Sequence, residues 1–494
     1  MITGKNYVGY NLMGTGTTKF RTFSPLLNKF NSWDFIEATD SEVNLAVDKA
    51  WDAFKQYRKR TPAERAMFLE LIATEIELLG DKLIEVYMLE SGLPESRAIA
   101  ERTRTLLQLR SFAAYLEEND SMFFIHPKST ELLSKKLIPL GPVVVFGASN
   151  FPLAYSTAGG DTVSALAAGC PVIVKSHPMH AGTGELVAAA VIKAALSAGM
   201  PDGVFSNLNC GDHRVGIQLV QHNSIKAVGF TGSLKGGRAL FDIANRRPEP
   251  IPVFAEMGST NPIVISEKTL NKKSAYWAEK IVESMIQSAG QFCTSPGLIL
   301  AVDSADLTAF SEFLTEKLEN KNNELMLGQV IKDSFSEQKA MMLAQKTTSV
   351  LSDKFTNNTL DSEPTILMTS GESFINNKLL HEEVFGSFLI IVKCKNQLEL
   401  EKIVENLDGQ LTGTLLVDEL EMENYSRLIE SFQYRVGRLI FNGVPTGVEV
   451  SQQMNHGGPY PASTDSRFTA VGTDSIFRWL RPVCYQNWIG ELFL

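Results

Sequence analysis

The feature that most constrains the fold is the alternation of short apolar runs with helical stretches between residues 141 and 258. The runs are "GPVVVFG", "PVIVK", "GVFSNLN", "IKAVGF" and "PVFAEMG", and they recur at intervals of roughly 25 to 30 residues. Strands spaced in this way, with helical crossovers between them, pair in parallel. The runs are continuously apolar, which is typical of strands covered on both faces. The sequence therefore predicts a doubly wound α/β sheet.

The remainder of the chain predicts further elements around this sheet. The first ~120 residues are mostly helical in pattern, as expected for "TPAERAMFLELIATEIELLG", where Thr61, Pro62 and Glu64 form a helix start and Gly80 a stop. A second α/β region begins after Gly258. Residues 123–140 are β-rich and interrupted by proline, which indicates a projecting hairpin. A length of 494 residues exceeds what one core supports, so two or three domains are expected.

Composition excludes several classes of partner. The net charge is −10, which disfavours nucleic acid and anionic membranes as main partners. No apolar run approaches the ~18 residues of a membrane span, and no secretory signal is visible. The five cysteines are widely spaced without a CxxC pair. We therefore expect a cytoplasmic protein with neither a disulfide framework nor a metal site.

Cys293 is the cysteine whose surroundings suggest chemistry. It lies in "QSAGQFCTSPG", among small and polar residues, whereas buried structural thiols usually have apolar neighbours. Composition alone leaves a buried spare thiol equally open. A cysteine hydrolase would need a histidine, for which His456 and His381 are candidates. The other possibility is a dinucleotide site beside the thiol. No GxGxxG follows the first strand, and a glycine–serine helix start at residues 232–233 is also a common cap.

Several stretches together resemble the aldehyde dehydrogenase superfamily in order and spacing. They are "GASNFPLAYSTAGGDTVSALAAGCPVIVKSHP", "FTGS", "FAEMGSTNPIVI", "QFCTSPG" and "EEVFGSFLIIV". The resemblance extends from about residue 5 to residue 490. The run "HGGPYPASTDSRF" departs from the family's commoner "PFGG.K.SG" pattern. It is similar to the branch that oxidises α-ketoglutaric semialdehyde.

The resemblance implies a catalytic trio. Cys293 would be the nucleophile, and the Asn150 side chain would donate to the oxyanion together with the Cys293 backbone N–H. Glu256 would be the general base that activates water. Taken singly, Asn150 could be a turn residue before Phe151, and Glu256 a solvated carboxylate at a strand end.

The resemblance also implies a nicotinamide cofactor. Lys175 matches a residue that contacts the adenosine ribose, and Pro178 replaces a glutamate that many members carry there. Loss of that carboxylate removes repulsion of a 2′-phosphate, so NADP is expected to be preferred, with NAD possible. The remaining positions expected to bind the cofactor are Ser176, His177, Arg214, Thr231, Gly232, Ser233, Glu383 and Phe385. For Arg214 a solvated helix residue is an equal alternative, and for Phe385 plain core packing.

The branch resemblance implies an acidic semialdehyde as substrate. Its carboxylate needs a cation, and Arg104 on a helix and Arg467 in "STDSRF" are the candidates, of which Arg104 is favoured. Alternatives are a broad-specificity or succinic or fatty aldehyde dehydrogenase, a thioesterase without redox chemistry, and a non-catalytic relative.

The implied fold is an aldehyde-dehydrogenase-like α/β architecture with a Rossmann-type cofactor domain. The expected cofactor domain covers residues 1–122 and 141–257, and an α/β catalytic domain covers 258–447. Residues 123–140 and 475–494 form a small β oligomerisation element, and 448–474 a C-terminal active-site loop region. The hairpin and the apolar tail predict a homodimer or homotetramer.

Overall fold

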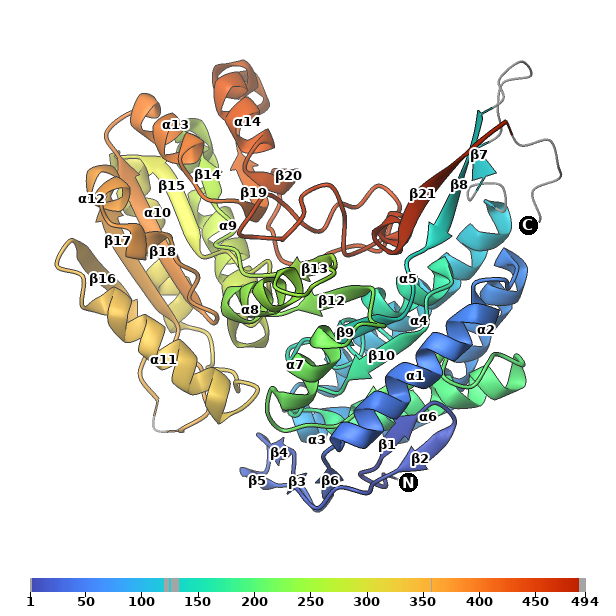
Figure 1. The fold of residues 1–494 in the computed structure, drawn as a ribbon. Helices are drawn as coiled ribbons and strands as arrows, with labels where there is room; N and C mark the ends of the chain where they lie inside the picture. Colours follow the sequence, from blue (N-terminus) through green and yellow to red (C-terminus); the bar gives the residue numbers. More distant parts are fainter. Residues whose placement is uncertain (1, 120–123, 126–132, 357, 488–494) are drawn as a thin grey trace. The chain divides into compact units, whose positions relative to one another are not determined.

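The computed structural model describes residues 2–119, 124–125, 133–356 and 358–487, and the chain forms two compact units (Figure 1). Unit 1 comprises residues 1–255, 450–453 and 468–494. Unit 2 comprises residues 256–449 and 454–467. Among the described residues, no helix combines the length and apolarity that a membrane crossing requires.

Unit 1 is built on a seven-stranded sheet in the order β13-β12-β9-β10-β11-β1-β2. The strands are β1 (Asn6–Val8), β2 (Asn11–Met13), β9 (Val143–Phe146), β10 (Val172–Lys175), β11 (Phe205–Leu208), β12 (Ala227–Thr231) and β13 (Val253–Glu256). Strand β9 pairs in parallel with both β10 and β12, whereas β1 pairs antiparallel with β11 at one edge. The order of β9 to β13 is that of a doubly wound sheet, as the strand spacing predicts.

Side-chain caps mark the starts of α1, α2 and α8 among the helices of unit 1. They are α1 (Asp40–Tyr57), α2 (Pro62–Glu77), α3 (Gly80–Ser91), α4 (Glu95–Glu118), α5 (Gly160–Ala168), α6 (Ala181–Ser197), α7 (Arg214–Gln221) and α8 (Leu234–Asn245). Thr61 and Glu64 form the predicted capping box, with Pro62 in the first turn. The predicted stop at Gly80 is wrong by a few residues, because α2 ends at Glu77 and Gly80 is the first residue of α3.

A three-stranded antiparallel sheet in the order β21-β8-β7 completes unit 1, with small two-stranded ribbons β3 (Lys19–Phe20)–β6 (Phe35–Ile36) and β4 (Phe23–Ser24)–β5 (Lys29–Phe30). Strand β8 (Leu133–Pro139) pairs with β7 (Phe124–Ile125) and with β21 (Leu480–Gln486). Figure 1 shows β8 and β21 as a long ribbon. Parts of the expected hairpin and of the apolar tail, residues 123, 126–132 and 488–494, lie outside the described residues.

Unit 2 contains a second seven-stranded sheet in the order β16-β17-β18-β15-β14-β19-β20. The strands are β14 (Ile263–Ile265), β15 (Leu298–Val302), β16 (Thr348–Asp353), β17 (Thr365–Ser370), β18 (Phe388–Cys394), β19 (Gln410–Leu416) and β20 (Val436–Phe441). The pairs β14–β15, β15–β18, β17–β18, β14–β19 and β19–β20 are parallel, and β16–β17 is antiparallel.

Both faces of this second sheet are buried. Leu298 and Leu300 of β15 pack into one core cluster, whereas Ile299 and Ala301 of the same strand pack into another. The alternation follows from the two-residue period of a strand. The helices that cover the two faces are α9 (Glu267–Ile286), α10 (Ala305–Glu319), α11 (Gln329–Leu343), α12 (Gly371–Asn376), α13 (Gln397–Glu405) and α14 (Ser426–Gln433), with 3₁₀ turns η2 (Gln287–Gly290), η3 (Lys378–His381) and η4 (Glu419–Tyr425).

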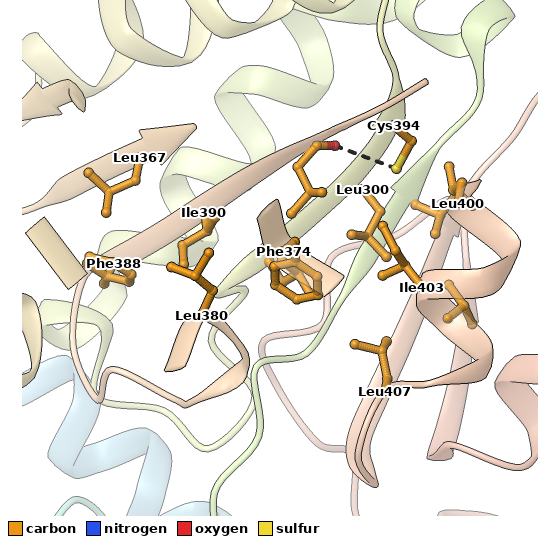
Figure 2. Packing of buried hydrophobic residues seen from close by; sticks show 14 of the residues in the cluster. Leu300, Leu367, Phe374, Leu380, Phe388, Ile390, Cys394, Leu400, Ile403 and Leu407 are labelled. Carbon is orange, nitrogen blue, oxygen red and sulfur yellow. Dashed lines mark hydrogen bonds between the residues drawn. The ribbon is translucent and has the colours of Figure 1, made fainter. Parts of the chain in front are cut away.

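Figure 2 shows the cluster beneath α12 and α13, where Phe374, Leu380, Leu400, Ile403 and other apolar side chains pack on β15 and β18. Cys394 lies within this cluster, fully buried, with its Sγ directed at the carbonyl of Val392. Burial raises the pKa of the Cys394 thiol to about 12. Cys394 is therefore a packing residue, in agreement with its apolar sequence neighbours.

Candidate active site

The Cys293 loop begins with a tight reversal after α9. Ser288, Ala289 and Gly290 take φ values of 50°, 57° and 71°, in the left-handed region that residues other than glycine rarely adopt. A Cβ at Gly290 would lie 2.3 Å from the carbonyl carbon of Gly386, so only glycine fits there. The reversal costs backbone strain, which persists only where surrounding contacts impose it. It delivers Cys293, partly exposed, at the amino end of β15.

Asn261 holds this loop from the neighbouring strand. Its Nδ2 donates to the carbonyls of Cys293 and Ser295 at 2.9 and 2.8 Å, and its Oδ1 accepts from Thr412 Oγ1 at 2.9 Å. Asn261 is fully buried and has a φ of 47°, a conformation that asparagine tolerates better than most residues. The two segments meet because Asn261 precedes β14 and Cys293 precedes β15, and parallel neighbours begin at the same edge of a sheet.

Three reactive side chains converge at this edge. Cys293 Sγ lies 3.6 Å from His456 Nε2, and the same nitrogen lies 3.1 Å from Glu256 Oε2. His456 and Glu256 are 2% and 3% exposed, so both are shielded from bulk water. The segment with His456 is anchored beside Glu256, because the N–H of Met257 donates to the carbonyl of Ala462 at 2.8 Å. A thiol, an imidazole and a carboxylate in contact can pass a proton along the series.

Glu383 and Phe385 line a cavity within unit 2, together with Ser259, Thr260 and Phe292. Burial raises the pKa of Glu383 to about 7, although a hydrogen bond from the Ser259 backbone opposes the shift, and the negative charge of Glu256 adds to it. A Cβ at Gly258 would lie 2.1 Å from Glu383 Oε2, so a larger residue there would displace this carboxyl. The two residues expected to hold the nicotinamide thus both line this cavity.

In unit 1, Asn150 follows β9 and Thr231 ends β12, and these two strands are neighbours in the sheet. From β9 the chain continues to β10 and β11 on one side, whereas β12 and β13 are added on the other side, so the strand order reverses between β9 and β12. The carboxyl ends of strands at such a switch point are where doubly wound sheets bind ligands. The Asn150 loop is fixed by Glu101, whose Oε1 accepts from the N–H groups of Leu153 and Ala154 at 2.8 and 2.9 Å. Arg97 Nη2 donates to the Asn150 carbonyl at 3.4 Å.

Lys175, Ser176 and His177 follow β10 directly. Lys175 Nζ donates to the carbonyl of Cys210 at 2.6 Å, and burial lowers the pKa of this lysine to about 8. Ser176 Oγ is buried and has no hydrogen-bond partner among the described residues. Burial lowers the pKa of His177 well below its usual value, and its Nδ1 accepts from the N–H of Met179 at 3.3 Å. His177 is therefore neutral at pH 7, with Nε2 as the N–H donor.

Arg214, the first residue of α7, is held by acidic neighbours. Its Nη1 donates to Asp40 Oδ1 at 3.0 Å, its Nη2 donates to the Ala38 carbonyl at 2.8 Å, and Glu37 lies at 3.6 Å. The arginine side chain is 42% exposed, so Arg214 is solvated as well as paired with acidic neighbours. The same neighbourhood contains a second thiol, since Cys210 Sγ donates to Asp212 Oδ1 at 2.9 Å.

Gly232 and Ser233 open α8, as the sequence indicates. Ser233 Oγ accepts from the Gly236 N–H at 3.2 Å and so caps the helix. A Cβ at Gly232 would lie 2.7 Å from the Phe230 ring, so a larger residue there would have to move this ring. The exposed start of this helix, next to Thr231, has the dipole and N–H groups that suit a pyrophosphate.

The two candidate arginines for a substrate carboxylate differ in their surroundings. Arg104 is half-buried on α4, where its Nη2 donates to Tyr155 Oη at 3.1 Å and its guanidinium lies 5.5 Å from the Tyr155 ring centroid. Arg467 is 79% exposed and forms a two-pronged contact with Asp465, at 2.8 and 2.6 Å. The positive charge of Arg467 is therefore already paired with the carboxylate of Asp465, at a position open to solvent.

Two residues of this site carried little or no signal in the sequence. His456 was visible as one of two possible histidine partners for the thiol, within an unusual "HGGPY" run. The other, His381, stacks on Phe374 and its Nε2 donates to the Phe374 carbonyl at 2.9 Å, so its ring packs against the core of unit 2, with no contact to the thiol in the described part of the chain. Asn261, in "GSTNP", had no sequence signal as a loop clamp, because the residues it clamps, Cys293 and Ser295, are more than 30 positions away in the chain.

Comparison with known proteins agrees with this geometry. Residues 13–469 match the model of the aldehyde dehydrogenase family. The chain is 42% identical to alpha-ketoglutaric semialdehyde dehydrogenase 2 of Azospirillum brasilense, over 99% of this chain and 95% of that protein. It is also 42% identical to the alpha-ketoglutaric semialdehyde dehydrogenase of Acinetobacter baylyi, over 94% of this chain and 91% of that protein.

A solved structure supports the fold. The 1-pyrroline-5-carboxylate dehydrogenase from Thermus with bound NAD superposes with a TM-score of 0.81 at 21% identity, over 97% of this chain and 92% of that one. The family match over most of the chain and the full-length relatives lead to one conclusion: this chain belongs to the aldehyde dehydrogenase family, and is an oxidoreductase that oxidises aldehydes with NAD(P).

Proposed function

We propose that this enzyme oxidises α-ketoglutaric semialdehyde to 2-oxoglutarate through a thioester on Cys293. The observation that carries the proposal is the contact of the Cys293 thiol with His456, and of His456 with Glu256, at 3.6 and 3.1 Å. The names of the two full-length relatives support the choice of substrate.

The chemistry begins with activation of the thiol. The Cys293 proton passes to His456, and Glu256 stabilises the imidazolium that results, since opposite charges at this distance in a shielded site attract strongly. The thiolate attacks the aldehyde carbon, which breaks the carbonyl π bond and forms a thiohemiacetal. Its oxyanion takes a hydrogen bond from the Cys293 N–H, and Asn150 is the proposed second donor; such a donor is typically worth about 3–4 kcal/mol of barrier.

The second half of the reaction releases the acid. A bound NAD(P)⁺ would supply the acceptor for the hydride that leaves the former aldehyde carbon. The thioester left on Cys293 is then hydrolysed, with Glu256 taking a proton from the attacking water and the sulfur leaving as a thiolate that regains its proton. The balance is aldehyde, water and NAD(P)⁺ converted to acid, NAD(P)H and a proton.

The residues present suit this cofactor. Ser176 Oγ is a buried hydroxyl with an unused hydrogen-bonding capacity among the described residues, directly after Lys175 at the end of β10. Thr231, Gly232 and Ser233 would receive the pyrophosphate at the start of α8. Glu383 would accept from the hydroxyls of the nicotinamide ribose, and Phe385 would pack against the ring.

We propose that NADP is preferred over NAD, because residue 178 is proline and Arg214 lies near the end of β11. The acidic neighbours of Arg214 weaken this preference, since Asp40 and Glu37 would also face a 2′-phosphate. Arg214→Ala should weaken the binding of NADP⁺ more than the binding of NAD⁺. The difference in binding free energy should be about 1.5–3 kcal/mol, the usual contribution of a charge-assisted contact. Asp40→Asn should strengthen the binding of NADP⁺ and leave the binding of NAD⁺ nearly unchanged. Dissociation constants for both cofactors measure this, and equal effects on the two would refute it.

We propose that Arg104 binds the distal carboxylate of the substrate. Its half-buried position against Tyr155 lowers competition from water, whereas Arg467 is already paired with Asp465. Arg104→Ala should raise KM for acidic semialdehydes about tenfold or more, and benzaldehyde should be little affected. Arg467→Ala is the matched control. If acidic and neutral aldehydes lose activity equally with Arg104→Ala, the arginine has a packing role.

The decisive experiment for the function is a panel of aldehydes with both cofactors, monitored through reduced cofactor. The Cys293–His456 contact would also serve acyl transfer, so esterase activity does not discriminate. Turnover of aldehyde without reduced cofactor would overturn the proposal. Glu256→Gln should keep a burst of reduced cofactor while steady-state turnover falls, because deacylation loses its base.

We further propose a cytoplasmic homodimer or homotetramer. The five cysteines form no disulfide in the described part of the chain, which suits a reducing compartment, and β8 and β21 provide strands for pairing across chains. The mass in solution, measured by light scattering, tests the oligomeric state.

A further inference from the structure

We propose that Cys293, His456 and Glu256 form a three-ligand site for Zn²⁺, whose occupation blocks the thiol. The site does not depend on the proposed substrate. Cysteine sulfur, imidazole nitrogen and carboxylate oxygen are the three kinds of zinc ligand found in proteins. All three are contributed here by separate segments of unit 2.

The distances between the ligand atoms match a tetrahedral zinc ion. Zinc bonds of about 2.3 Å to sulfur and about 2.0–2.2 Å to nitrogen and oxygen separate sulfur from nitrogen by about 3.6 Å, and nitrogen from oxygen by about 3.4 Å. The observed separations are 3.6 Å for Cys293 Sγ to His456 Nε2 and 3.1 Å for His456 Nε2 to Glu256 Oε2. One ligand atom from each residue lies within 4.8 Å of the others. Little rearrangement is needed to bind the ion.

The carboxylate provides a second reason for the assignment. Both oxygens of Glu256 are buried and accept no hydrogen bond among the described residues, and the contact with His456 is at ion-pair distance without hydrogen-bond geometry. A buried carboxylate without hydrogen bonds costs free energy that a cation recovers. Three protein ligands leave the fourth position of a tetrahedral zinc ion for a water molecule. Because Cys293 is partly exposed, water can reach this position from the side of Cys293.

A second group of possible ligands, in unit 1, differs from the proposed zinc site in its donors and in their hydrogen bonds. Glu37, Cys210 and Asp212 also bring ligand atoms within 4.8 Å. There is no imidazole among these three residues, and their donors and acceptors are engaged. Cys210 Sγ donates to Asp212 at 2.9 Å, and Glu37 accepts from the Gly211 N–H at 3.0 Å. This cluster serves as an internal comparison for the zinc site.

Binding is written as an exchange of a proton for the metal. The Cys293 thiol loses its proton to solvent, the sulfur binds Zn²⁺ as thiolate, and His456 and Glu256 bind through Nε2 and a carboxylate oxygen. No redox change occurs. With the sulfur lone pair engaged, the thiol cannot attack an aldehyde, so Zn²⁺ inhibits reversibly.

The test uses Co²⁺ as a spectroscopic substitute for Zn²⁺ on the chelator-treated full-length chain, in a Cys484→Ser background that removes the exposed thiol. We expect one Co²⁺ per chain, with visible bands of a tetrahedral ion and a thiolate-to-cobalt band in the near ultraviolet, all abolished by one equivalent of Zn²⁺. Cys293→Ser should eliminate the thiolate band. His456→Ala should weaken binding at least about 100-fold, more than loss of an outer contact costs. Cys210→Ser should leave the spectrum unchanged.

Several outcomes overturn the inference. A thiolate band that survives Cys293→Ser, or that disappears with Cys210→Ser, would place the metal elsewhere. Unchanged affinity in His456→Ala would exclude the imidazole as a ligand. Absence of Co²⁺ binding in an enzyme that still oxidises aldehydes with NAD(P) refutes the zinc site alone and leaves the proposed function intact. Inhibition by Zn²⁺ that a chelator reverses supports the site only together with the spectra.

Discussion

Two thiols in this molecule sit beside carboxylates, and their surroundings give them opposite chemistry. Cys210 in unit 1 is fully buried, and its S–H donates a hydrogen bond to Asp212. Burial together with that hydrogen bond raises the pKa of the Cys210 thiol. Cys293 in unit 2 is partly exposed and faces His456, behind which lies Glu256. A carboxylate next to a thiol holds the proton on sulfur, whereas an imidazole can remove it. The group between thiol and carboxylate therefore decides reactivity.

The largest expected effect comes from removing each sulfur. Cys293→Ala should lower the rate of aldehyde oxidation by about 10⁴-fold or more, because the covalent intermediate cannot form. Cys210→Ser, which keeps a donor to Asp212, should cost far less. The measurement is kcat/KM with reduced cofactor as readout. Comparable losses in the two variants would abolish the distinction between the thiols.

Removing the imidazole comes next. His456→Ala should lower kcat/KM by about 10²–10⁴-fold, the range for loss of a general base, and should slow alkylation of Cys293 at pH 7. His381→Ala is the matched control, since that ring packs on Phe374 and should affect stability without changing alkylation of Cys293. If alkylation is unaffected by His456→Ala, the contact with the thiol has no role in its activation.

The clamp on the Cys293 loop should produce an intermediate effect. Asn261→Ala removes buried donors to the carbonyls of Cys293 and Ser295, so the free energy of unfolding should fall by about 1–3 kcal/mol, and kcat should fall with it. Asn261→Gly also loses the donors but tolerates the φ of 47°, so it separates hydrogen bonding from backbone strain. Denaturant unfolding and kcat are measured for both. Full activity in the glycine variant would reduce the role of Asn261 to backbone conformation.

The smallest effect concerns the thiol of Cys210. A raised pKa means that the folded chain keeps this proton at a pH where an unfolded thiol, with its ordinary pKa of about 8.5, would lose it. The stabilisation is present below the ordinary pKa and is lost as pH rises through the raised value. Asp212→Asn should lower the pKa of Cys210. The free energy of unfolding of this variant should then fall slightly less steeply with pH above about 8.5 than that of the wild type. Unfolding free energies between about pH 7 and 10 measure this, and identical pH profiles would contradict it.

Much of unit 1 could be predicted because its signals are local. Continuous apolar runs at regular spacing indicated parallel strands, and the capping box of Thr61 and Glu64 indicated the start of α2. The stop at Gly80 was displaced by a few residues: α2 ends at Glu77, and Gly80, with a left-handed φ of 57°, is the first residue of α3. The partners of Arg104 and Arg214 could not be predicted from such local signals, although Arg214 does stay exposed on α7. Tyr155 and Asp40, which engage them, are 51 and 174 residues away in the chain.

The sequence by itself determined the α/β class and the resemblance that marked Cys293, Glu256 and Asn150, because these depend on local patterns and on short motifs in order. Only the tertiary structure decided that His456 joins Cys293, since the two are 163 residues apart and no spacing rule relates them. It also decided that Asn261 clamps the Cys293 loop and that Arg467 is paired with Asp465. For Asn261 and Cys293 the physical reason is that the parallel strands β14 and β15 begin at one edge of the sheet, whereas His456 lies in the loop after β20, which is held beside Glu256 by the bond from Met257 N–H to the Ala462 carbonyl.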